Sequence, residues 1–195
     1  MTKQSGETQK KSKRRWLIFG LAAVGLPAVI VMSLALTVVV ALAFFVILYL
    51  FLVQPHQIMG IAMEPTYKNG AYVLTDKISY KSRLPKRGEI VVYENSKYGG
   101  DFIHRIIGLP GDRISISNGK AFINDLPLEE PYLYPGSRTS GAEFLADGTI
   151  ATVPVDQYFV LGDNREHSTG SQYFGFVSRQ DIIGRVMFCY TNCGR

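Results

Sequence analysis

The chain has 195 residues, a length that fits one domain of ordinary size and a further segment. Its net charge of +5 comes from residues 1–15, which hold six lysines and arginines against one glutamate. From residue 54 onward, 15 basic and 15 acidic residues balance. The basic character therefore reflects a short arm beside an apolar run, and we expect no nucleic-acid partner.

The apolar run extends from Trp16 to Val53 without a charged residue. As one helix it would measure roughly 57 Å, well beyond the roughly 30 Å hydrocarbon core of a bilayer. A cleaved signal peptide fits poorly, because its apolar stretch is only about 7–15 residues long. We therefore predict a membrane anchor over residues 16–53, with its main span within about Leu34–Val53.

The number of spans stays open. Trp16–Val31 is either partly embedded or forms a second span that turns around Pro27 to Ser33. The positive-inside rule keeps the arm of residues 1–15 in the cytoplasm. One span then places residues 54–195 outside the plasma membrane, whereas two spans would return them to the cytoplasm.

Residues 54–195 contain short β-branched and aromatic runs separated by Gly, Pro and Asn, a pattern typical of an all-β domain. Residues 132–152 are predicted to form a long loop. The predicted strands are Ala71–Thr75, Glu89–Tyr93, Phe102–Gly108, Arg113–Ser117, Lys120–Ile123, Gln157–Leu161 and Ile183–Tyr190.

The clearest turn signal is the Asn-Gly pair within Ser117–Lys120, which suits the positive φ angles of a type I′ turn. A hairpin folded at this turn has one apolar face, as expected of a half-buried sheet. That face consists of Ile114, Ile116, Ala121 and Ile123.

Two cysteines, Cys189 and Cys193, lie close to the C-terminus. In an oxidising compartment they can pair, and in a reducing one they stay free thiols. A metal site needs about four ligands, and no His cluster or CxxC lies nearby. We expect no metal and no cofactor.

Four stretches carry a family resemblance. They read GIAMEPT at Gly60–Thr66, KRGEIVV at Lys86–Val92, DFIHRIIGLPGD at Asp101–Asp112 and YFVLGDNR at Tyr158–Arg165. In this order and spacing they resemble the conserved boxes of type I signal peptidases, the serine–lysine membrane proteases that remove secretory signal peptides. The resemblance covers essentially all of the part after the anchor. It implies a membrane-tethered antiparallel β domain to which a peptide adds as an extended strand.

The resemblance also implies a serine nucleophile and a buried lysine base, deprotonated because burial disfavours its charge. Here Ala62 stands at the nucleophile position and His104 at the lysine position. Gly170 and Gln172 replace an Asp and an Arg that the family pairs as ions. Ser168, whose hydroxyl orients the lysine in the family, is retained. Four changes in one constellation predict that catalysis is lost.

The alternatives explain less. An engineered serine-to-alanine change would account for Ala62 alone. His104 is a base near neutral pH, yet a base without a nucleophile hydrolyses nothing unless it activates water directly. Thr66 or Ser168 as a relocated nucleophile would lie away from the backbone N–H groups that stabilise the oxyanion.

Two further groups of residues remain open to two interpretations. Ile58, Met63, Phe102 and Ile103 line the peptide groove by resemblance, or are simply core and strand residues. His104 and His167, with Asp163 or Glu166, are the arrangement closest to a metal site, but hydrogen-bonded or exposed histidines are the usual case. Asp163, Asn164 and Arg165 are expected to hold a turn rather than to touch substrate.

The sequence therefore predicts a catalytically inactive, membrane-anchored signal-peptidase homologue. Its expected partner is an extended segment of a secreted or pilus-like protein, with the chain acting as an assembly chaperone or modulator. The competing hypothesis is an active signal peptidase that cleaves signal peptides from secreted preproteins with unconventional or substituted residues. A third is a structural subunit that modulates an active paralogous signal peptidase.

The predicted orientation can be tested by cysteine accessibility labelling of the variants Thr8→Cys and Ser140→Cys, with the parent chain as control. One span predicts that the two positions are labelled from opposite sides of the membrane. Labelling of both from the cytoplasmic side would establish two spans and place the β domain in the cytoplasm.

Overall fold

The computed structural model describes residues 27–47, 49 and 53–194. Internal contacts divide the chain into two units, Met1–Leu50 and Phe51–Arg195. The basic arm of residues 1–15 and the apolar residues 16–26 lie outside the described residues, so the predictions about them stay predictions.

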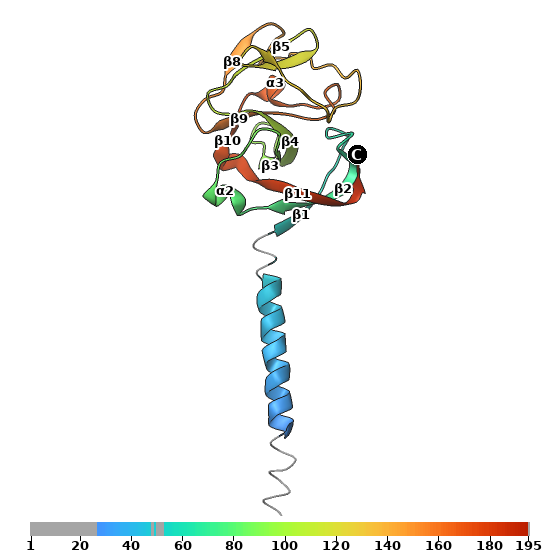
Figure 1. The fold of residues 1–195 in the computed structure, drawn as a ribbon, viewed down its shortest axis with the longest axis vertical. Helices are drawn as coiled ribbons and strands as arrows, with labels where there is room; N and C mark the ends of the chain where they lie inside the picture. Colours follow the sequence, from blue (N-terminus) through green and yellow to red (C-terminus); the bar gives the residue numbers. More distant parts are fainter. Residues whose placement is uncertain (1–26, 48, 50–52, 195) are drawn as a thin grey trace, which may run out of the picture. The chain divides into compact units, whose positions relative to one another are not determined.

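The first unit contains an α-helix over Pro27–Ile47, long and apolar enough to cross a membrane (Figure 1). Its 21 residues correspond to roughly 32 Å, which matches the hydrocarbon core. Its side chains are all exposed, which suits a helix surrounded by lipid. The hydroxyls of Ser33 and Thr37 donate to the carbonyls of Ile30 and Ser33, both at 2.9 Å.

This helix corrects two predictions. The main span was expected within Leu34–Val53, but the helix already includes Pro27, and Val53 is the first residue of a strand. A turn at Pro27 to Ser33 is also wrong, because these residues are helical. The sequence does not show where the helix ends within the apolar run, because the run continues without a charged residue as far as Val53.

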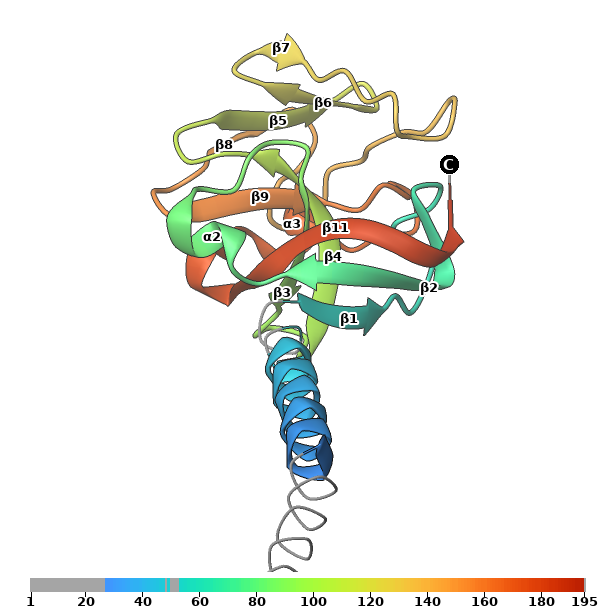
Figure 2. The same cartoon turned by 60° about the horizontal axis from the view of Figure 1, so that its bottom comes forward.

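The second unit consists of two antiparallel sheets (Figures 1 and 2). The larger has the strand order β1-β2-β11-β3-β4-β9-β10 and the smaller β7-β6-β5-β8. The strands are β1 Val53–Gln57, β2 Tyr67–Asp76, β3 Ile90–Glu94, β4 Asp101–Gly108, β5 Arg113–Ser117, β6 Lys120–Ile123, β7 Leu126–Pro127, β8 Ile150–Thr152, β9 Gln157–Leu161, β10 Val177–Ser178 and β11 Ile182–Cys193.

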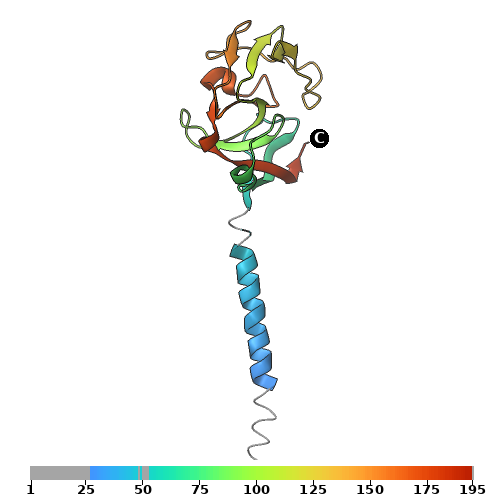
Figure 3. The ribbon, with the colours of Figure 1, turned by 60° about the vertical axis from the view of Figure 1, so that its left-hand side comes forward.

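Helices in this unit are short, as the sequence predicted: α2 is Ser79–Ser82, α3 is Ser171–Phe174 and a 3₁₀ turn covers Arg179–Asp181. Figure 3 shows the two sheets from the side, with the strands of the smaller sheet gathered at the end of the unit away from β1. The all-β antiparallel fold that the sequence predicted is thus observed.

The predicted strands all form, and β5, β6 and β9 have the predicted bounds. Four strands were missed. β1 lay at the end of the predicted anchor, and its Pro55 is tolerated because β1 is an edge strand of the sheet. β8 lies within the predicted loop of residues 132–152 and pairs with β5; at three residues it is too short to show a period.

The predicted hairpin connects β5 and β6. Asn118 and Gly119 have φ angles of 52° and 80°, as a type I′ turn requires. Ile114 lies opposite Ile123 and Ile116 opposite Ala121, and all four side chains are buried. The isoleucines pack against Phe159 and Leu161 of β9, so the hairpin face joins the smaller sheet to the larger.

Cys189 and Cys193 form a disulfide at the end of β11, with their Cα atoms 5.7 Å apart. Of the two alternatives left open by the sequence, the structure has the paired form. The bridge lies where β11 makes several irregular steps against β2.

Candidate functional site

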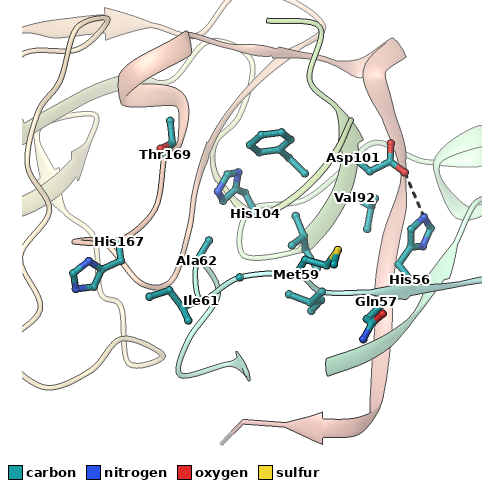
Figure 4. Close-up of a pocket in the computed structure, with 14 residues that line it drawn as sticks. His56, Gln57, Met59, Ile61, Ala62, Val92, Asp101, His104, His167 and Thr169 are labelled. Atoms are coloured by element: carbon teal, nitrogen blue, oxygen red, sulfur yellow. Dashed lines mark ion pairs between the residues drawn. The ribbon is translucent and has the colours of Figure 1, made fainter. Parts of the chain in front are cut away.

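An open cavity of about 550 Å³ lies between the segment that follows β1 and the first half of β4 (Figure 4). Residues 56–62 form one wall and residues 101–104 the other, and Val92 of β3 contributes between them. His167 and Thr169, in the loop after β9, complete the lining. Segments distant in sequence thus meet at one hollow, which contains Ala62 and His104.

Ala62 lies in a tight turn that is fastened to the loop after β9. Its carbonyl accepts a hydrogen bond from the N–H of Asn164 at 2.9 Å, and the Asn164 side chain donates to the Ile61 carbonyl at 3.1 Å. The N–H of Ala62 has no hydrogen-bond partner among the described residues. The turn therefore holds residue 62 in the cavity wall, but its methyl group offers no atom that can attack a carbonyl.

His104 is fully buried between two hydroxyl groups. Its Nδ1 lies 2.7 Å from the Tyr93 hydroxyl and its Nε2 lies 3.1 Å from Ser168 Oγ. Both ring nitrogens are thus engaged, one as donor and the other as acceptor, which is what a neutral imidazole requires. His104 and Ser168 are brought together as the sequence predicted, and Tyr93 is an added partner.

Burial lowers the pKa of His104 from its usual value near 6.5 to about 4. A cation at this position would lose its hydration, and the groups that bond to the ring are uncharged hydroxyls. Burial also raises the pKa of the Tyr93 hydroxyl, which stays neutral as well. The imidazole is therefore a weak base, because neither of its partners is a carboxylate that stabilises the imidazolium as in a serine–histidine–aspartate triad.

A buried ion pair joins three of the four family-like stretches. Arg105 Nε donates to Asp163 Oδ1 at 2.8 Å, and the hydroxyl of Thr66 donates to the other carboxylate oxygen. The guanidinium carbon of Arg105 lies 4.0 Å from the centre of the Tyr132 ring. Thr66 is therefore part of this network, which does not favour it as a relocated nucleophile.

A second buried pair holds the loop after β9. Arg165 binds the carboxylate of Glu130 and donates to Thr139 Oγ1 at 2.6 Å and to the Gly162 carbonyl at 2.9 Å. Asp163, Asn164 and Arg165 thus all bond within the fold, as expected for residues that hold a turn.

The packing is tight at Gly170 and Gln172, the two positions where the resemblance implies an ion pair. Gln172 is buried, and its Oε1 has no hydrogen-bond partner among the described residues. A Cβ atom on Gly170 would lie 2.7 Å from that Oε1 and 2.8 Å from the Val160 carbonyl oxygen. The backbone therefore has no room for an aspartate at position 170 without a shift of the β9 backbone.

The four predicted groove residues do not share one role. Ile58, Phe102 and Ile103 line the cavity, whereas Met63 does not. Met63 is completely buried and packs in the core with Ile58 and the start of β2. A turn such as the one after β1 has no simple period, so the sequence could not tell the direction of this side chain.

Among the residues described, no group of three or more His, Cys, Asp or Glu side chains could hold a metal ion. His167 lies in the cavity wall, but its exposed ring points away from His104 (Figure 4). The sequence also gave no indication of His56 and Asp101, which line the same cavity. His56 lies near the end of β1 and Asp101 at the start of β4, and the local sequence does not indicate that these two strand ends lie close together.

Comparison with known proteins shows which family the chain resembles. The family described as signal peptidase, peptidase S26, matches residues 31–191. The chain is 37% identical over 161 residues to the probable signal peptidase I-2 of Synechocystis sp., covering 80% of this chain and 71% of that protein. It is 34% identical over 158 residues to signal peptidase IB of Staphylococcus aureus strain Mu50, covering 74% and 82%.

A solved structure is also similar. It is the crystal structure of a signal peptidase I from Enterococcus faecalis V583, with a TM-score of 0.46 and 30% identity, covering 54% of this chain and 98% of that one.

The buried neutral His104 predicts a specific pH dependence of stability. Because its folded pKa is about 4 against an ordinary 6.5, the unfolded chain takes up a proton between these values that the folded chain does not. The free energy of unfolding should therefore fall by up to roughly 3 kcal/mol as pH drops from 6.5 to 4. Urea unfolding of the detergent-solubilised chain across this range measures it.

The variant His104→Gln should flatten this slope whatever its own stability, since the titrating group is gone. His167→Gln, at an exposed position, is the matched control and should keep the slope. An equal slope in the wild type and His104→Gln would show that His104 is not held neutral by burial.

Proposed function

Because the chain belongs to the signal peptidase family, peptidase S26, we propose that it is a membrane-anchored homologue that binds an extended peptide without hydrolysing it. The observation that supports this most directly is that one cavity contains an alanine at position 62 and a buried, neutral His104. Neither supplies what peptide hydrolysis requires, a nucleophile and a base able to accept its proton.

The cavity also forms a groove beside β4, and the start of β4 has the unpaired strand edge that strand addition requires. Residues 101–103 of β4 pair with β3 on one side, while the pairing of β4 with β9 begins only at Arg105. Residues 101–104, which lack a partner strand on that second side, also line the cavity. An extended peptide can hydrogen-bond to this free edge, with its side chains against Ile58, Phe102 and Ile103.

The proposed partner is an extended segment of a secreted or pilus-like protein, which the chain would hold as an assembly chaperone or modulator. An apolar helix long enough to cross a membrane supports a role at that surface. With the basic arm in the cytoplasm, the β domain would meet its partner outside the plasma membrane. Modulation of an active paralogous signal peptidase fits the same groove.

One observation favours a second candidate, an active signal peptidase that uses Ser168 as nucleophile. Ser168 Oγ lies 3.1 Å from His104 Nε2, within reach of proton transfer. Against it, Ser168 is buried behind the cavity wall and does not line the cavity, and neither hydrogen-bond partner of His104 is a carboxylate. We therefore favour the non-hydrolytic function.

The function can be tested with the purified full chain and a secreted preprotein. We expect no cleavage over hours, together with measurable binding of a signal-peptide segment by fluorescence anisotropy. Specific cleavage that is abolished both by Ser168→Ala and by His104→Ala would overturn the proposal and establish the second candidate. Cleavage that survives both changes would indicate a contaminating protease.

Repair of the site should proceed in steps. Ala62→Ser alone should restore little activity, because a serine hydroxyl needs a positioned base and His104 is a weak one. Adding His104→Lys should restore more, since Ser168 remains to orient the amine. The further changes Gly170→Asp and Gln172→Arg should give the highest rate, since small displacements of a catalytic group can cost about 100-fold.

The last step should also lower stability, because a side chain at residue 170 must displace the Val160 carbonyl. Cleavage rates and melting temperatures of the wild type and the three variants measure both effects. If Ala62→Ser alone reaches the rate of the quadruple variant, then His104 is a competent base and the lost ion pair is irrelevant.

A further inference from the structure

The end of the cavity away from His104 is polar. His56 of β1 and Asp101 at the start of β4 face one another there across the groove (Figure 4). His56 Nδ1 lies 3.0 Å from the hydroxyl of Thr75, which fixes the ring. His56 Nε2 is enclosed and lacks a hydrogen-bond partner among the described residues, and it lies 3.9 Å from Asp101 Oδ2.

The separation of 3.9 Å between His56 Nε2 and Asp101 Oδ2 is too long for a hydrogen bond, so the two side chains lie side by side without a direct bond. Enclosed polar atoms without a partner are rare in proteins and call for a physical explanation. The Asp101 side chain is 49% exposed, so its carboxylate remains open to a group that enters the groove.

Asp101 also lies in a locally acidic setting. The residue directly opposite Asp101 is Glu94 of β3. Like charges that lie directly opposite one another on neighbouring strands are unfavourable. Lys97, in the turn between these strands, lies over the Tyr98 ring. In the described part of the chain, no lysine or arginine comes within 4.0 Å of either carboxylate.

Among the described residues that line the cavity, none is a lysine or arginine, and Asp101 is the single carboxylate. From these contacts we infer that Asp101, which lies beside His56, makes the groove select a peptide with a cationic side chain. This inference rests on the proposed peptide binding and names one feature of the peptide. A lysine or arginine of the peptide would supply the positive counter-charge that the carboxylates of Asp101 and Glu94 do not have within the described part of the chain.

The position of the cationic residue follows from strand geometry. Asp101 precedes His104 by three residues on β4, which corresponds to about 10 Å along an extended chain. A peptide running beside β4 therefore places its cationic residue about three positions from the residue beside His104, and because side chains alternate along a strand these two peptide residues point to opposite faces.

The probe is a fluorescein-labelled ten-residue alanine–serine peptide, in which lysine, glutamine or glutamate replaces each position in turn. Its affinity for the full chain in detergent is measured by fluorescence anisotropy at pH 7.5. Lysine should bind up to about five-fold more tightly than glutamine at one position, and glutamate more weakly, as expected for a partly exposed ion pair.

Asp101→Asn should abolish this preference, and Glu94→Gln should reduce it. His56→Leu should reduce the lysine-to-glutamate ratio more than the affinity for the neutral peptide, because it replaces the polar side chain that lies beside Asp101. The matched control is Glu129→Gln, an exposed carboxylate that lines no part of the groove, and it should leave the ratio unchanged.

The outcomes separate the two proposals. If the peptides bind with equal affinity whatever their charge, the selectivity is refuted while peptide binding stands. If no peptide of the series binds, both proposals fail. Selectivity that persists in Asp101→Asn would also refute the role given to this residue.

Discussion

The buried carboxylate of Asp163 requires a cation, and Arg105 supplies it. Both groups are largely removed from water, so loss of either partner would leave an uncompensated charge at a cost of about 3–5 kcal/mol. Thr66 binds the same carboxylate, and thus the turn after β1, strand β4 and the loop after β9 are joined at one point. The relative placement of Ala62, His104 and Ser168 depends on this junction.

The junction does not depend on the side chains at the positions where the family resemblance places a nucleophile and a base. Arg105 and Asp163 do not line the cavity, and their bonds do not depend on the side chain at residue 62. His104 adds two hydrogen bonds to hydroxyls and fills a buried site while staying neutral. Burying a neutral ring at this position costs less free energy than burying a cation would, because the hydroxyls that bond to the ring offer no counter-charge.

Binding an extended peptide and cleaving it make different demands on the same groove. Cleavage needs a nucleophile, a base and a geometry held to within about 1 Å. Strand addition needs a free backbone edge and side-chain pockets, and here the free edge of β4 and the walls from Ile58 and Phe102 supply them. The polar end at Asp101 can then add selectivity without any contribution to catalysis.

Several features follow from local sequence. The Asn118–Gly119 turn and the apolar face of its hairpin were predictable because a two-residue period and a positive-φ turn are local properties. The presence of an apolar helix was predictable for a similar reason, since length and composition alone decide whether a helix is apolar enough to cross a membrane. The family-like stretches also identified Ala62, His104 and Ser168, and two of these meet as expected.

Other features depend on strand pairing and packing, which no local pattern records. The main span was misplaced because the apolar run continues to Val53, where β1 forms by pairing with β2. Met63 is buried in the core because the turn after β1 directs its side chain inward. Tyr93 reaches His104 because β3 and β4 are neighbouring strands. The tight space around Gly170 and the approach of His56 to Asp101 arise where distant segments converge. The sequence by itself thus identified Ala62, His104 and Ser168 as residues of the site. Only the tertiary structure decided which other residues join them and which atoms meet, because those distances are set by the pairing of strands far apart in the chain.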